Sequence, residues 1–134
     1  MDELDQRREP ASIDANGIKP PPAYVIRDAP APAGVVVLAL EGELDMAAAP
    51  ELRGRVDEAE GALVLDLGGA TFIDSAVLKE LLRARAELAA RDVRLVLAAV
   101  PPTVLRLLDL TRTGELFDQV ADAGEAVRIV STAS

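Results

Sequence analysis

The chain has 134 residues, of which 50% are hydrophobic, and a formal net charge of −9 at pH 7. This length predicts one domain with a substantial core. Because only Tyr24, Phe72 and Phe117 are aromatic, that core must be aliphatic. The acidic charge argues against nucleic acid and anionic membrane surfaces as partners, since both require a basic footprint. The absence of Cys and His excludes thiol catalysis, disulfides, the usual zinc sites and a Ser-His-Asp triad, so we expect no catalytic residue, metal or cofactor.

The N-terminal region predicts a tail followed by a folded domain. Residues 1–22 are polar, mixed in charge and end in consecutive prolines, which predicts a flexible tail ahead of a domain at 23–134. The N-terminus has no apolar signal core. Apolar runs such as VVVLAL at 35–40 are too short to span a bilayer. We therefore expect a cytoplasmic protein without membrane insertion.

The first half of the domain predicts a hairpin, a helix and a strand. AYVIRDA at 23–29 predicts an edge strand, and a turn rich in proline separates it from the long apolar strand GVVVLALEGEL at 34–44. Pro50 fits the first position of the following helix, because a backbone N–H at that position makes no intrahelical hydrogen bond. ALVLDL at 62–67 is typical of a strand covered on both faces, and the glycine pair 68–69 is expected to end it.

The second half predicts three helices and two strands. A helix is expected from Asp74 or Ser75 to about Ala90, followed by a covered strand at 93–100. The remaining elements are a helix that starts at Pro101–Pro102 and is broken by Gly114, a short strand at 115–120 and a last helix at 124–130. Strands that alternate with helices indicate a sheet with parallel members, so the fold class is α/β.

Two of these helices show an apolar stripe that should face the core. The residues expected to face inward are Val77, Leu78, Leu81, Leu82, Leu88 and Ala89 in the first, and Val104, Leu105, Leu107 and Leu108 in the second.

The candidate site is the pair Asp74 and Ser75, which stands between a buried strand and an amphipathic helix. A helix N-terminus has unpaired N–H groups and a positive dipole, so a phosphate on Ser75 would be tolerated locally. Such a phosphate adds about −1.5 to −2 charges at neutral pH. Both residue types are also favoured helix caps that contribute about 1 kcal/mol. Asp45, in the loop before the helix of Pro50, is expected to accept hydrogen bonds from nearby backbone N–H groups.

Four stretches of the chain resemble the STAS domain of bacterial anti-sigma factor antagonists. They are LEGELDMAAAPEL at 40–52, VLDLGGATFIDS at 64–75, RLVLAAVPPTVLRLLDLTRTGELF at 94–117 and ADAGEAV at 121–127. The resemblance implies a mixed sheet of four to five strands with helices packed mainly on one face.

The resemblance also implies a function and the residues that carry it. Ser75 would be the phosphoacceptor, and the partner would be an anti-sigma factor that is itself a serine kinase of the ATP-binding, histidine-kinase-like type. The unphosphorylated protein would bind that factor and release a sigma factor, and the protein would not be an enzyme. The partner-binding residues implied are Asp45, Asp74, Ser75, Val77 and Lys79.

The chain departs from the STAS pattern in the first turn of this helix. The common pattern is Asp-Ser-Ser-Gly-Leu-Gly, whereas this chain has Ala76, Val77 and Lys79 in place of the second Ser and the two Gly residues. Glycine there leaves a shallow surface for a partner, and Val77 and Lys79 are expected to fill it. The alternative function is therefore an accessory STAS subunit of a lipid or anion transporter, which is not phosphorylated.

Overall fold

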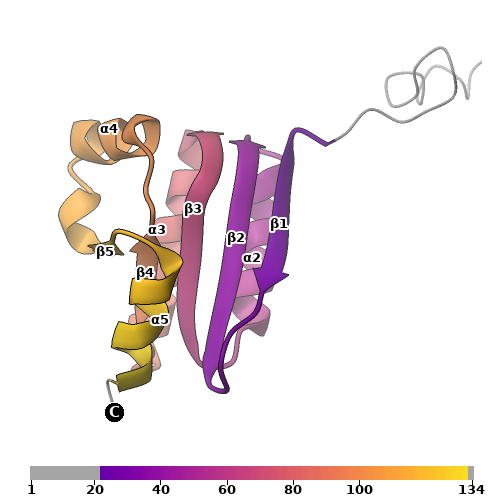
Figure 1. Ribbon diagram of the computed structural model, residues 1–134. Helices are drawn as coiled ribbons and strands as arrows, with labels where there is room; N and C mark the ends of the chain where they lie inside the picture. Colours follow the sequence, from indigo (N-terminus) through magenta and orange to yellow (C-terminus); the bar gives the residue numbers. More distant parts are fainter. Residues whose placement is uncertain (1–21, 133–134) are drawn as a thin grey trace, which may run out of the picture.

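The structure is a computed structural model that describes residues 22–132 (Figure 1). The predicted tail, apart from Pro22, lies outside the described residues. The elements in chain order are β1 (Tyr24–Ala29), β2 (Val35–Leu44), α2 (Ala48–Glu58), β3 (Ala62–Ile73), α3 (Ser75–Ala90), β4 (Leu95–Ala98), α4 (Pro102–Thr111), the 3-10 helix η2 (Gly114–Leu116), β5 (Asp118–Val120) and α5 (Ala123–Thr132).

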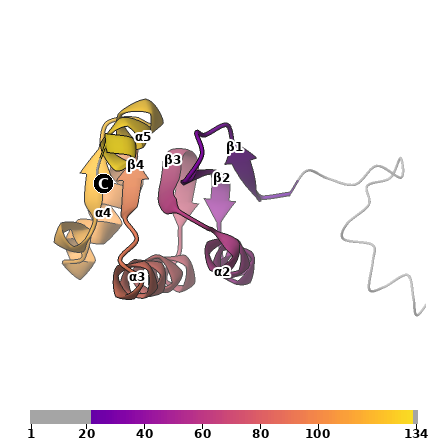
Figure 2. The ribbon, with the colours of Figure 1, turned by 90° about the horizontal axis from the view of Figure 1, so that it is seen from below.

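The five strands form one sheet in the order β1-β2-β3-β4-β5. The β1–β2 pair is antiparallel, as expected for the predicted hairpin, and the other three pairs are parallel. The expected α/β class with a mixed sheet is confirmed. Figure 2 shows α2 and α3 side by side on one face of the sheet and α5 on the other.

The aliphatic composition produces a separate core on each face of the sheet. The larger core lies under α2 and α3, and it takes the inward residues of both helices and alternate residues of β2 and β3. The smaller core lies under α5 and is built from Val37, Val64, Val96, Ala98, Ala126 and Val130. Strands β2 to β4 are therefore covered on both sides, which explains their continuous apolar sequences.

Several predicted boundaries are wrong. Helix α2 begins at Ala48 rather than Pro50, because the Asp45 carbonyl already accepts a hydrogen bond from the Ala48 N–H at 2.9 Å. Gly68 does not end β3, which continues to Ile73. The pairing of β3 with β2 shifts register in this region, so the strand passes the glycine pair as an irregularity instead of a turn.

The end of α4 is another wrong boundary. The helix stops at Thr111 and not at Gly114, because Arg112 adopts the left-handed conformation with φ of 58°. The strand predicted at 93–100 is shorter than expected and is bracketed by positive φ angles at Asp92 and Ala99. Of the predicted inward residues, Ala89 and Leu105 are exposed, and Leu82 and Leu107 are only half-buried.

Candidate functional site: a surface at the carboxyl ends of β2 and β3

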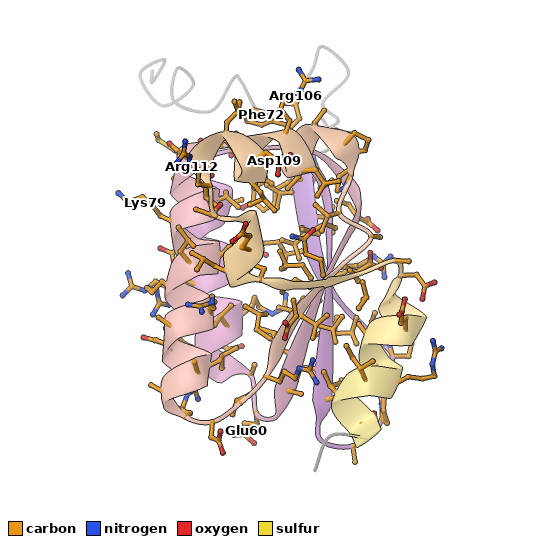
Figure 3. All side chains as sticks on the ribbon, turned by 90° about the vertical axis from the view of Figure 1, so that its left-hand side faces the viewer. Glu60, Phe72, Lys79, Arg106, Asp109 and Arg112 are labelled. Atoms are coloured by element: carbon orange, nitrogen blue, oxygen red, sulfur yellow. The ribbon has the colours of Figure 1, made fainter. Side chains whose placement is uncertain are left out.

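The predicted site residues come together because β2 and β3 are parallel neighbours that end side by side. Leu44 and Ile73, the last residues of the two strands, are register partners. The backbone N–H of Asp74 donates to the carbonyl of Leu44 at 3.2 Å, which fixes the two strand ends to one another. Asp45, which opens the loop after β2, and Asp74, which joins β3 directly to α3, therefore lie at the same end of the domain, the end where Figure 3 labels Phe72.

Asp74 is the N-cap of α3. Its backbone is extended, with φ of −99° and ψ of −178°, and its Oδ1 accepts hydrogen bonds from the N–H groups of Ala76 at 2.9 Å and Val77 at 3.2 Å. Its carbonyl accepts the first intrahelical bond, from the Leu78 N–H at 3.0 Å. This geometry satisfies two of the N–H groups that every helix start leaves unpaired. Asp74, and not Ser75, therefore supplies the capping interaction.

Ser75 is the first residue of α3 and is exposed to solvent. Within residues 22–132 its hydroxyl makes no hydrogen bond, because the capping positions are taken by Asp74. A group attached to Ser75 Oγ would thus displace no side-chain interaction of the described domain.

Asp45 organises the loop that leads from β2 into α2. Its Oδ1 accepts a hydrogen bond from the Ala47 N–H at 3.0 Å, and its carbonyl accepts one from Ala48. The expectation that Asp45 binds local N–H groups is confirmed. Asp45 is exposed, and it directly follows Leu44, whose carbonyl is bonded to the N-cap residue of α3.

Tyr24 contacts the end of the same loop and the first turn of α2. Its hydroxyl donates to Glu51 Oε1 at 2.9 Å and lies 3.4 Å from the carbonyl oxygen of Ala47. Burial, the hydrogen bond to Glu51 and the negative charges of Glu51 and Asp45 raise the pKa of Tyr24 above its usual value. This interaction ties β1 to the first turn of α2, so the position of Asp45 depends on both.

Two of the departures from the STAS pattern have different structural consequences. Val77 is fully buried in the core under α3, so the expectation that its side chain fills the partner-facing surface is wrong. The helical period explains the error, because Val77 lies two residues after Ser75 and points away from it. Lys79 is exposed and extends outward from α3 (Figure 3).

Sequence reasoning missed two exposed apolar residues at this end of the domain. Met46 is 65% exposed directly after Asp45, and Phe72 is 47% exposed two residues before Asp74. The signal for Phe72 was available: it alternates with the strand residue Ile73, which faces the core, and it is one of few aromatic residues. Exposed apolar side chains next to polar ones are typical of protein interaction surfaces.

The family of the chain follows from comparison with known proteins. The family model described as the STAS domain matches residues 27–126. The chain therefore belongs to the STAS domain family, as its fold and the Asp-Ser helix start indicate. No curated protein sequence matches the chain. Within the residues that the structure describes, no helix is long and apolar enough to cross a membrane.

Several solved structures have a similar fold. An anti-sigma factor antagonist from Mycobacterium paratuberculosis has a TM-score of 0.70 and 26% identity, with 81% of this chain and 94% of that chain covered. SpoIIAA in its unphosphorylated form has a TM-score of 0.66 and 22% identity, with 81% and 99% covered. A sulfate transporter family protein from Wolinella succinogenes has a TM-score of 0.68 and 18% identity, with 77% and 89% covered.

Proposed function

We propose that this chain is a regulatory binding protein, an anti-sigma factor antagonist, and that phosphorylation of Ser75 controls its binding. In its unphosphorylated form it binds an anti-sigma factor and so releases a sigma factor in the cytoplasm. The anti-sigma factor is also the serine kinase, of the ATP-binding, histidine-kinase-like type. The similarity to the Mycobacterium paratuberculosis antagonist supports this class of function.

The observation that carries the phosphoacceptor proposal is the division of roles between Asp74 and Ser75. Asp74 caps α3 through Oδ1, whereas the Ser75 hydroxyl is exposed and makes no hydrogen bond within the described residues. The γ-phosphoryl group of ATP would pass to Ser75 Oγ, with ADP released and the hydroxyl proton taken up by the kinase. The fold loses no contact in this step, so the phosphate changes only the surface.

The docking surface in this proposal is made of the loop between β2 and α2, the end of β3 and the start of α3. Its polar members are Asp45, Asp74, Ser75 and Lys79, and its apolar members are Met46 and Phe72. Exposed apolar side chains at the same end of the domain as these carboxylates suit a partner surface that is apolar with basic neighbours. A phosphate on Ser75 would place about −1.5 to −2 additional charges in a contact that must be desolvated, which opposes docking.

The test is incubation of the chain with the purified anti-sigma kinase and Mg-ATP, followed by mass spectrometry and a binding assay. Wild type should gain one phosphate on Ser75. Ser75→Ala should remain unlabelled and still bind, whereas Ser75→Asp should bind weakly. Ser131→Ala, which removes an exposed hydroxyl from α5, is the matched control and should be labelled like wild type. Tight binding without any phosphate on Ser75 would refute the switch.

The second candidate is an accessory STAS subunit of a lipid or anion transporter, without phosphorylation. The fold similarity to the Wolinella succinogenes sulfate transporter family protein favours it. The departure at Val77 no longer supports this reading, because that side chain is buried. Co-purification with transporter subunits, with no binding to an anti-sigma kinase, would select this candidate.

A further inference from the structure

Lys79 is an exposed cation one helical turn beyond Ser75. Within residues 22–132 it forms no ion pair, in contrast to its neighbour Glu80, which binds Arg83 at 3.0 Å. Residues four apart lie on the same face of a helix, with Cβ atoms about 5–6 Å apart. Ser75 and Lys79 thus share one exposed face of α3, and Figure 3 shows the Lys79 side chain extending outward from the helix.

We propose that Lys79 is the intramolecular partner of a phosphate on Ser75. This inference rests on the proposed role of Ser75 as phosphoacceptor and extends it to the regulation of the same site. The ammonium group of Lys79 binds the phosphate dianion, and the negative group precedes the positive one by four residues, which is the favourable order on a helix.

The pairing would offset a repulsion between the phosphate on Ser75 and the neighbouring carboxylate of Asp74. A phosphate on Ser75 stands next to the carboxylate of Asp74, which is committed to the N–H groups of Ala76 and Val77 and cannot turn away without uncapping the helix. Lys79 offsets the repulsion between these two negative groups. The common STAS pattern has Gly at this position and supplies no such cation, so the phosphorylated form of this chain is stabilised by its own side chain.

The experiment uses the full chain with phosphoserine introduced at position 75 during translation, so that it needs no kinase. The second pKa of the phosphate, ordinarily about 6, is measured by phosphorus NMR. It should be lower in the wild-type protein than in Lys79→Gln by about 0.15–0.4 units, which is the free energy of an i,i+4 ion pair on a helix converted to pKa units. The control is Arg91→Gln, which removes one exposed positive charge just beyond the other end of α3.

The remaining charged side chains at this end of the domain are common to all three proteins, so their effects cancel in the comparison. They include Glu43, Asp45, Asp74, Arg106, Asp109 and Arg112. The inference holds if Lys79→Gln raises the phosphate pKa and Arg91→Gln leaves it unchanged. Equal values in the wild type and Lys79→Gln, or equal shifts in the two variants, would overturn it. Because the phosphoserine is encoded, failure of a kinase to label Ser75 refutes the proposed switch without affecting this result.

Discussion

The backbone N–H of Asp74 donates a hydrogen bond to the carbonyl of Leu44 at 3.2 Å. This bond joins the ends of two parallel strands and makes the Asp45 loop and the start of α3 one continuous surface. A partner that contacts Ser75 must also meet the neighbouring loop, where Met46 is exposed. The proposed docking surface is therefore a consequence of strand register as much as of the residues themselves.

Removal of the cap should separate the structural role of Asp74 from the proposed regulatory role of Ser75. Asp74→Ala should lower the free energy of unfolding by about 1 kcal/mol, because the N–H groups of Ala76 and Val77 lose their acceptor. Ser75→Ala should change it by less than about 0.5 kcal/mol, as expected for a surface substitution away from any such feature. Urea denaturation of both variants measures the difference. If Ser75→Ala is the more damaging of the two, our assignment of the cap is wrong.

Val77 should behave as a core residue and not as part of the binding surface. Val77→Ala should lower the free energy of unfolding by about 1.5–3 kcal/mol, because it removes two buried methyl groups and leaves a cavity. Lys79→Ala, two residues further along the same helix, should have an effect below about 0.5 kcal/mol. Denaturant titration of the two variants tests this contrast, which would fail if Val77→Ala were as stable as wild type.

The sequence predicted the elements better than it predicted their ends. Hydrophobic runs and periodicity placed β2, β3 and α3 correctly because burial on one or two faces dictates those patterns. The start of α2 depends on a hydrogen bond between Asp45 and Ala48, and the passage of β3 through Gly68 depends on its pairing with β2. Neither interaction can be predicted from the composition of the local sequence.

Only part of the candidate site could be predicted from the sequence, because the rest depends on interactions between elements. The Asp-Ser helix start can be recognised in the sequence, but the choice of Asp74 as cap depends on the direction of its side chain. The burial of Val77 was predicted by its place in the apolar stripe of α3, and it overrules the partner-binding role that the resemblance implied for this residue. The apolar members Met46 and Phe72 become a surface only when β2 and β3 end side by side.

Two glycines should respond in opposite directions to substitution by alanine. Gly42 has a φ of 85°, and a Cβ there would collide with the backbone carbonyl of Ala23, so Gly42→Ala should destabilise the β1–β2 hairpin by more than about 1 kcal/mol. Gly54 lies within α2 with no atom near the position of a Cβ, so Gly54→Ala should stabilise the protein by about 0.5–1 kcal/mol. Thermal unfolding of the two variants should shift in opposite directions, and a shift in the same direction would contradict the backbone geometry described here.

Tyr24 offers a direct test of the contacts that hold the Asp45 loop, because it is the only tyrosine in the chain and no Trp is present. Its phenolate absorbance should titrate with a midpoint above 10.0, since burial and then the bond to Glu51 raise its pKa. A raised folded-state pKa means that the native state holds this proton more tightly than the unfolded state does. The corresponding stability is therefore fully present below pH 10.0 and is lost as the pH rises through the folded-state value.

Glu51→Gln should lower that midpoint only part of the way to the usual value, because burial, the larger cause, remains. Glu58→Gln, which removes an exposed carboxylate from the opposite end of α2, should leave the midpoint unchanged. Circular dichroism at each pH confirms that the domain is still folded during the titration. A midpoint that does not respond to Glu51→Gln would mean that the bond between Tyr24 and Glu51 does not hold β1 to α2 in solution.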